Sequence, residues 1–144
     1  MDTNTGTAPA ENKSFTRFFP HIARILMGLA FLAFGVMGLL HLGKPPADLP
    51  EVVKTVNAAL MTAGYMDVAS TVMTLVGALL LINRFVPLAL ALIAPILVGI
   101  LTYHIAIYPS TIGMGVFFTL LELYLAWSYR SAFRPMLAGR VRPG

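Results

Sequence analysis

Four apolar runs separated by short polar segments dominate the hydrophobic pattern of the chain. The longest run, residues 85–106, contains no Asp, Glu, Lys or Arg. A helix of that length rises about 33 Å at ~1.5 Å per residue, and the hydrocarbon core of a bilayer is ~30 Å thick. The pattern therefore predicts an all-α membrane protein with spanning helices over about residues 19–42, 67–82, 85–106 and 111–129.

The segment between the first two runs is not continuously apolar. Lys44, Pro45 and Pro46 cannot continue a helix. Apolar residues then recur at helical spacing between charged and polar ones: Leu49, Val52, Val53, Val56, Leu60 and Ala63. This spacing predicts a short amphipathic helix at 50–63, which lies on the bilayer surface or caps the bundle.

Composition supports the same class. The chain has 144 residues, of which 58% are hydrophobic and 11% charged, whereas soluble domains have about 25% charged residues. There is no cysteine, which excludes thiol–disulfide chemistry by this chain alone and thiolate metal sites. We expect a disordered cytoplasmic tail at 1–18, a four-helix transmembrane domain at 19–134 and a basic cytoplasmic tail at 135–144.

The basic residues predict the orientation. Most of them precede the first helix, join the second to the third, or follow the fourth, whereas Lys44 and Lys54 alone lie on the other side, among acidic residues. Because positively charged loops remain inside, both termini are expected in the cytoplasm. The predicted location is the cell inner membrane, with several passes. Gly28, Gly35 and Gly38 of the first helix supply positions for close helix packing.

Glu122 is the most informative polar residue, because it falls near the middle of the fourth helix. A carboxylate at that depth is costly, so it should face the bundle interior and be paired or protonated. Small or polar residues share its face: Gly115, Thr119, Ala126 and Tyr129. Two interpretations are open, a carboxyl group that carries protons or binds a ligand, and a buried acid that only fixes helix packing.

His41 and His104 both fall near the outer ends of their helices, so they are expected at one depth, above Glu122. We assign Glu122 and His104 as candidate catalytic residues. Candidate cofactor-binding residues are His41, His104, Tyr103, Thr119 and Thr74, around a pocket that could hydrogen-bond a quinone. Histidines and a carboxylate can also bind a transition metal, but no HxxH or ExxH spacing is present, so no metal is predicted. The histidines could equally be interfacial groups that only bind water, and Asp67 is interpreted as an acid that favours the dipole of the second helix.

Motifs of other functional classes are absent from the sequence. We find no phosphate-binding loop, no dinucleotide fingerprint, no GxSxG and no nucleic-acid-binding patch. Anionic lipid explains the basic tail more simply than nucleic acid does. The expected partners are the lipid bilayer and other membrane redox subunits or a second copy of the chain, with no nucleic acid.

Several stretches resemble DoxX-like membrane proteins. The resemblance rests on Ala23–Gly35, Gly64-Tyr65, Gly77–Leu90 with its Asn-Arg-Phe-Val-Pro-Leu-Ala-Leu, Ala94-Pro95, His104, and Ala126–Leu137 with its Tyr-Arg-Ser-Ala-Phe-Arg-Pro. It covers about residues 20–138 and implies a four-helix bundle with a link to membrane redox systems, since the family takes its name from subunits of a thiosulfate:quinone oxidoreductase. Many relatives have a Glu where Thr74 stands, and relatives that oxidise thiols use cysteines that this chain lacks.

The resulting functional hypothesis is an accessory or quinone-contacting subunit of a membrane redox system. At most, the chain is an oxidoreductase subunit, and whether it is an enzyme stays open. The alternatives are a non-enzymatic assembly or interaction protein, in which the same residues only pack the bundle, and a carrier of protons or a small solute.

Overall fold

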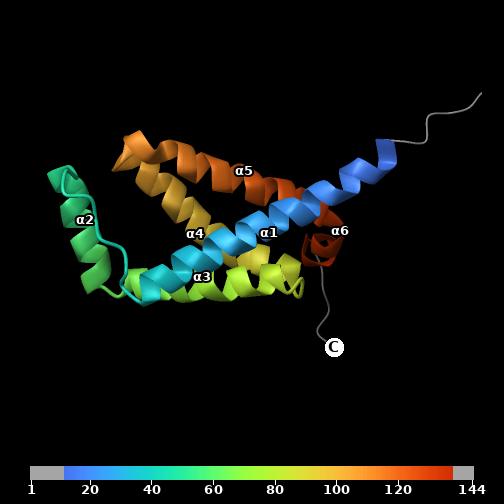
Figure 1. The fold of residues 1–144 in the computed structure, drawn as a ribbon, viewed down its shortest axis with the longest axis horizontal. Helices are drawn as coiled ribbons and strands as arrows, with labels where there is room; N and C mark the ends of the chain where they lie inside the picture. Colours follow the sequence, from blue (N-terminus) through green and yellow to red (C-terminus); the bar gives the residue numbers. More distant parts are fainter. Residues whose placement is uncertain (1–11, 138–144) are drawn as a thin grey trace, which may run out of the picture.

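The structure is a computed structural model, and it describes residues 12–137. That part of the chain is helical with no strand, as the sequence predicts. The long elements are α1 (Asn12–Leu39), α2 (Glu51–Thr62), α3 (Tyr65–Leu81), α4 (Val86–Ala106) and α5 (Ile112–Ser128) (Figure 1). Short elements are η1 (Pro109–Thr111), α6 (Arg130–Phe133) and η2 (Arg134–Leu137). The tails predicted at 1–18 and 135–144 lie outside the described residues except for 12–18, which belong to α1, and 135–137, which belong to η2.

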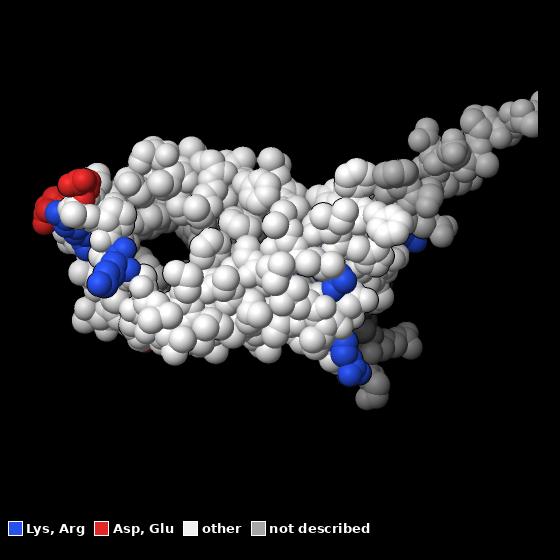
Figure 2. Space-filling view, in the orientation of Figure 1, with Lys and Arg blue, Asp and Glu red and all other residues white. Residues whose placement is uncertain are grey.

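The apolar helices are compatible with a membrane protein. Three of them are long and apolar enough to cross a bilayer: Phe18–Leu39, Val86–Ala106 and Pro109–Ser128. α3 is shorter and meets the same test only together with α2, from which it is bent by 77°. Figure 2 shows charged side chains at the two ends of the visible face and an uncharged band between them. A molecule with that distribution can place its middle in hydrocarbon and both ends in water.

The helices pass between two ends of an elongated molecule (Figure 1). We call one the α2 end; it contains α2, the end of α1, the start of α3 and the junction of α4 with α5. The other is the terminal end; it contains the start of α1, the α3–α4 turn and α6. α1 and α4 therefore run toward the α2 end, and α3 and α5 run back.

α1 and α3 end in the same hydrogen-bonded turn. At the end of α1, the His41 and Leu42 amides donate to the carbonyls of Gly38 and Met37. At the end of α3, the amides of Asn83 and Arg84 donate to Leu80 and Leu79 in the same pattern. Such a turn requires a left-handed residue, usually Gly or Asn. Asn83 fits this rule at φ 56°, whereas His41, at φ 50°, is a less common occupant.

Glycines bring α1 and α3 into direct contact. Gly28 on α1 meets Gly77 on α3, Gly35 meets Thr74, and Gly38 meets Ser70. A Cβ atom on Gly77 would lie 2.7 Å from the Cα of Leu32 and 2.8 Å from the carbonyl oxygen of Gly28. The backbones are therefore too close for any side chain, which is how small residues join helices inside membranes. The close-packing role predicted for the three glycines of the first helix is confirmed.

The core lies on the inner faces of α1, α3, α4 and α5. Its largest fully buried side chains include Met27, Phe31, Leu90, Ile93 and Leu125. Phe31 also packs against Phe118 of α5, with ring centroids 5.4 Å apart. Arg24, only 6% exposed, directs its guanidinium to the carbonyls of Leu80 and Leu81 at the end of α3. A cation at that position compensates the negative end of the helix dipole.

Candidate functional site

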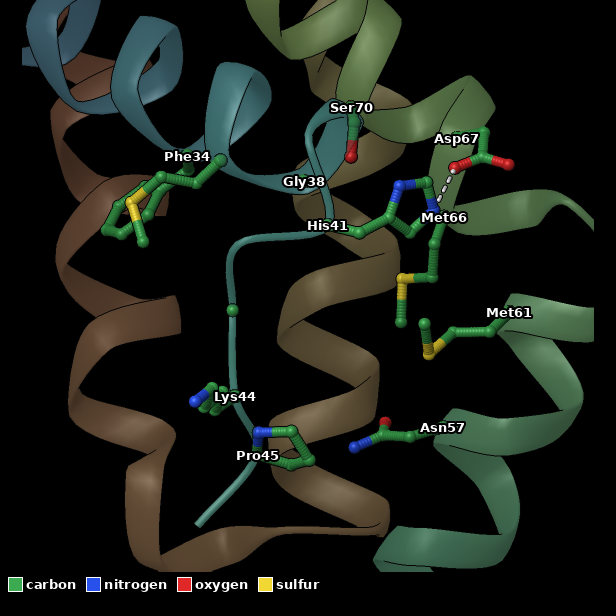
Figure 3. Close-up of a pocket in the computed structure, with 12 residues that line it drawn as sticks. Phe34, Gly38, His41, Lys44, Pro45, Asn57, Met61, Met66, Asp67 and Ser70 are labelled. Atoms are coloured by element: carbon green, nitrogen blue, oxygen red, sulfur yellow. Dashed lines mark ion pairs between the residues drawn. The ribbon is translucent and has the colours of Figure 1, made fainter.

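A pocket of about 480 Å³ opens at the α2 end. Figure 2 shows the surface hollowed there, next to the charged residues, and Figure 3 shows the pocket in detail. Four segments line it: the end of α1, the loop that follows, α2 and the start of α3. The lining residues are Phe34, Met37, Gly38, His41, Gly43, Lys44, Pro45, Asn57, Met61, Met66, Asp67 and Ser70. Its volume falls within the roughly 300–1,000 Å³ of ordinary small-molecule sites.

An imidazole–carboxylate pair lies on one side of the pocket. The Nε2 atom of His41 is 3.3 Å from Oδ1 of Asp67, and both side chains are more than half exposed. Nε2 is therefore the ring nitrogen that contacts the carboxylate, and Nδ1 is the nitrogen that remains for a ligand. Ser70 lies beside this pair (Figure 3). The pair therefore presents one imidazole nitrogen and a carboxylate to a ligand in the pocket.

A second polar group lies on the opposite side of the pocket. There, Asn57 of α2 faces the loop residues Lys44 and Pro45 (Figure 3). The Tyr103 hydroxyl of α4 donates to Oδ1 of Asn57 over 2.8 Å. Because this bond occupies the amide oxygen, the amide nitrogen of Asn57 remains as a donor toward the pocket. Tyr103 thus positions a pocket residue without lining the pocket itself.

Flexible apolar side chains occupy the space between the two polar groups. Met61 of α2 and Met66 of α3 lie between Asn57 and His41 in Figure 3. Phe34 and Met37 of α1 complete the apolar lining. Methionine adapts its shape to a ligand and makes favourable contacts with flat rings. The pocket therefore combines an adaptable apolar centre with hydrogen-bonding groups at two separate edges.

The predicted site residues fall into two groups in the structure. His41 lines the pocket, and Tyr103 supports it through Asn57. His104, Thr119 and Glu122 are not among the lining residues: His104 lies at the contact of α4 with Gly115 of α5, and Thr119 and Glu122 lie one and two turns further along α5. Among residues 12–137, no three His, Asp or Glu side chains are grouped closely enough to hold a metal ion.

Thr74, predicted as a cofactor-binding residue, does not line the pocket. It lies against Gly35 in the tight α1–α3 contact, and its hydroxyl donates to the carbonyl of Ser70 over 2.8 Å. A threonine that bonds back to its own helix leaves no free donor for a ligand. At this position it packs the two helices together.

The predicted inward orientation of Glu122 is confirmed, since the residue is only 9% exposed. Its neighbours on the same face, Gly115 and Thr119, are buried and half-buried respectively. Across the interface, His104 approaches Gly115: a Cβ on that glycine would lie 3.6 Å from Nδ1 of His104. Gly115, Thr119 and Glu122 thus follow one face of α5, and His104 of α4 approaches that face at Gly115.

Sequence reasoning misses most of the pocket. Lys44, Asn57, Met61 and Met66 are far apart in sequence and belong to a loop and two helices. The sequence indicates only a first-turn acid at Asp67, yet this residue pairs with His41. The available signal is the amphipathic segment 50–63, in which the polar Asn57 lies among apolar residues. Its contact with the C-terminal end of α4, through Asn57 and Tyr103, is a tertiary contact that periodicity does not show.

Comparison with family models, curated proteins and solved structures finds no match. The resemblance to DoxX-like proteins thus stays a prediction from the sequence. The function is therefore inferred from the chemistry of the pocket and from the distribution of charge.

Proposed function

We propose that the chain is a four-helix inner-membrane protein whose pocket receives the head group of a quinone. In this proposal it is an accessory or quinone-contacting subunit of a membrane redox system of the DoxX type. A quinone exchanges electrons and protons together, and the electrons are supplied or withdrawn by a redox partner subunit. The residues of this chain bind the ring, orient it and exchange protons with it.

The observation that carries the proposal is the arrangement of polar groups in the pocket. A quinone is a flat apolar ring with carbonyl oxygens on opposite edges. The pocket has His41 at one edge, the Asn57 amide and Lys44 at the other, and methionines between them. Such a site satisfies both carbonyls and covers the ring with polarisable side chains. An apolar ligand with a single polar end would leave one of these edges without a partner.

The His41–Asp67 pair supplies the proton chemistry that this ligand needs. Imidazole changes its charge near neutral pH more readily than any other side chain. Asp67 contacts the ring at Nε2, which leaves Nδ1 to donate to a carbonyl or to accept from a hydroxyl. The left-handed backbone of His41 supports a role for its side chain, because glycine would satisfy that turn with less strain.

The charge distribution supports an orientation with both termini in the cytoplasm. Between residues 18 and 137, the charged residues of the terminal end are all arginines: Arg24, Arg84, Arg130 and Arg134. Arg130 stacks on Trp127, 4.5 Å from its ring centre, in the manner of an interfacial anchor. The α2 end carries acids beside its lysines. By the positive-inside rule the pocket then lies near the outer surface, with α2 at the interface and α3 as the fourth, shorter span.

Binding of a short-chain ubiquinone to the purified protein in lipid nanodiscs tests the proposal. We expect His41→Gly to weaken binding at least about tenfold, a loss of ~1.4 kcal/mol, while preserving the turn that ends α1. Tyr103→Phe should weaken binding several-fold by releasing the Asn57 amide. Thr55→Val is the matched control on α2, since Thr55 only bonds back to the Glu51 carbonyl and does not line the pocket.

Three results would contradict the proposal. Equal binding by the parent protein and the three variants would place the quinone outside this pocket, in the surrounding lipid or elsewhere in the bundle. Absence of binding, together with a polypeptide that co-purifies from the native membrane in fixed ratio, would favour an assembly protein. Uptake of a solute or of protons by sealed vesicles without quinone would favour a carrier.

A further inference from the structure

We infer that Glu122, Thr119 and His104 form a buried proton-sharing site between α4 and α5, separate from the pocket. The site itself does not depend on what the pocket binds. Its connection to the pocket, described below, rests on the proposed function.

The two helices direct the ionisable side chains toward one another. α4 and α5 run in opposite directions, and the close approach of Leu101 and His104 to Gly115 sets their register. Side chains on a helix tilt toward its N-terminus. His104 therefore tilts toward the terminal end, and Glu122 tilts back toward the α2 end. Thr119 lies between them, one turn from Gly115 and one turn from Glu122.

The hydrogen bonds that are present determine which atoms remain free. Nδ1 of His104 lies 2.6 Å from the carbonyl oxygen of Ile100. A carbonyl only accepts, so Nδ1 carries the hydrogen and Nε2 keeps its lone pair. The Thr119 hydroxyl donates its hydrogen to the Gly115 carbonyl over 2.8 Å. Because that hydrogen is already used, the Thr119 oxygen can act toward a further partner only as an acceptor. A protonated carboxyl group is a donor of the kind it could accept from.

These free atoms allow one proton to be bound at either of two positions, the Glu122 carboxyl group or Nε2 of His104. In the first, Glu122 is a carboxylic acid whose hydroxyl donates to the Thr119 oxygen, and His104 is neutral. In the second, the O–H bond of Glu122 is broken, and an N–H bond forms at Nε2 of His104 through an intervening water. The products are a carboxylate and an imidazolium, so the total charge of the site does not change. Gly115 leaves room at the contact, since a Cβ atom added to it would meet its nearest neighbours only at ordinary van der Waals distance.

Few other ionisable groups face this site from the packed helices. On α1, the buried Arg24 is engaged with the carbonyls at the end of α3. Within the described residues, no ion pair involves Glu122, and Asp67 of α3 pairs with His41 at the pocket. The other titratable groups of α4, α5 and their ends are phenols: Tyr103 on α4, Tyr108 just after it, Tyr124 on α5 and Tyr129 at the end of α5. His104 is thus the natural exchange partner for Glu122.

Tyr103 connects the site to the pocket. Its ring meets His104 edge-on at 5.4 Å between centroids, and its hydroxyl bonds to Asn57 on the pocket wall. If the pocket binds a quinone as proposed, this arrangement gives the ligand a proton store inside the membrane. The store is reached through the α4 side of the pocket, opposite the His41–Asp67 pair.

Infrared difference spectra between acidic and alkaline pH test the site in nanodiscs without added quinone. The carboxylic-acid C=O band lost in Glu122→Gln identifies Glu122. We expect His104→Phe to change the pH at which this band appears, and Thr119→Val to raise its frequency by removing the hydrogen-bond acceptor. Thr71→Val is the matched control, because Thr71 makes the same bond to its own helix, to Asp67, on an exposed face. It should leave the band unchanged.

A Glu122 band that is identical in His104→Phe, Thr119→Val and the parent protein would overturn the inference. If His104→Phe fails to fold, Thr119→Val and the ¹⁵N spectrum of the His104 ring in Glu122→Gln still decide it. An unchanged His104 spectrum means that the two groups are independent. Loss of quinone binding alone, with the infrared coupling intact, would refute the proposed ligand and leave this site standing.

Discussion

The α1–α3 and α4–α5 contacts join antiparallel helices in the same molecule by opposite means. The first is a backbone contact: Gly28 meets Gly77, and Gly35 meets Thr74, with no space for another atom. The second is a side-chain contact, in which His104 lies over Gly115 at ordinary distance and Glu122 is buried nearby. The glycine contacts of the first interface have no ionisable group between them, although Arg24 lies where α1 meets the end of α3. At the second, His104 lies in the contact, and Glu122 is buried on the face of α5 that carries Gly115.

This difference suggests that the α1–α3 contact serves mainly the stability of the fold and the α4–α5 contact mainly proton exchange. A contact without free volume or titratable groups can only hold two helices in register. A looser contact with a buried acid and a histidine is costly to retain in a membrane, and such residues mark functional sites by default. We therefore expect substitutions in the first contact to affect folding, and substitutions in the second to affect proton exchange more than folding.

The largest expected effect is at Gly77. Alanine there would place a Cβ against the backbone of Leu32 and Gly28, which cannot move aside as a side chain could. Overpacking of this kind costs about 1–3 kcal/mol and more where backbone is involved, so Gly77→Ala should unfold at clearly lower temperature in detergent. Gly115→Ala is the matched control and should stay within about 0.5 kcal/mol of the parent. Equal losses for both would abolish the distinction between the contacts.

The next effect is expected at Arg24, where α1 meets the end of α3. Arg24→Met keeps the apolar stem but removes the donors for the Leu80 and Leu81 carbonyls. The Leu80 carbonyl keeps the Asn83 amide, but both carbonyls lose their charged donor. A hydrogen bond to a charged group contributes about 1.5–3 kcal/mol, a loss that thermal unfolding would report. Arg134→Met, at an exposed site in η2, should change stability little. An unchanged melting temperature for Arg24→Met would show that water can replace the guanidinium.

At Glu122 the expected change in stability is smaller and of opposite sign. Replacing a buried ionisable group by an apolar one of similar size is often neutral or stabilising, and we expect Glu122→Leu to gain about 1 kcal/mol in detergent unfolding. The same variant should lose the carboxylic-acid band. A loss of several kcal/mol would instead assign Glu122 to helix packing, which is the alternative interpretation of this residue.

Tyr103→Phe should have the smallest effect on stability. It removes a single half-buried hydrogen bond, to Asn57, worth about 0.5–1.5 kcal/mol. Its effect on quinone affinity should exceed its effect on unfolding temperature, because the Asn57 amide loses its fixed orientation. Matching losses in the two measurements would reduce Tyr103 to a structural link between α2 and α4.

The sequence predicts the helices well because their causes are local. Missing charges mark the apolar runs, and Pro45, Pro46 and Asn83 mark their interruptions. The spanning helix predicted from about residue 19 matches the apolar span that begins at Phe18. α1 itself begins earlier, at Asn12, because residues 12–17 continue the helix ahead of that span. The inward face of Glu122 and the packing role of the α1 glycines also follow from spacing alone.

The pocket does not follow from the sequence in the same way. His41 and His104 are expected to share one cavity because both fall near the outer ends of their helices. Two residues at the same depth along their helices can still face different neighbours, however. His41 follows the end of α1 and lines the pocket, whereas His104 lies on the face of α4 that meets α5. The partners of His41 come from α2 and α3 through tertiary contacts, and the 77° bend between these helices has no clear sequence signature beyond Gly64.

The backbone at His41 has a practical consequence for protein engineering. Methods that choose residues by backbone conformation will favour glycine there, as they would at any left-handed helix end. A thermostabilised version obtained in this way would express well and keep its fold. It would also lack the imidazole that faces Asp67, so a stability screen would select against the group most worth assaying.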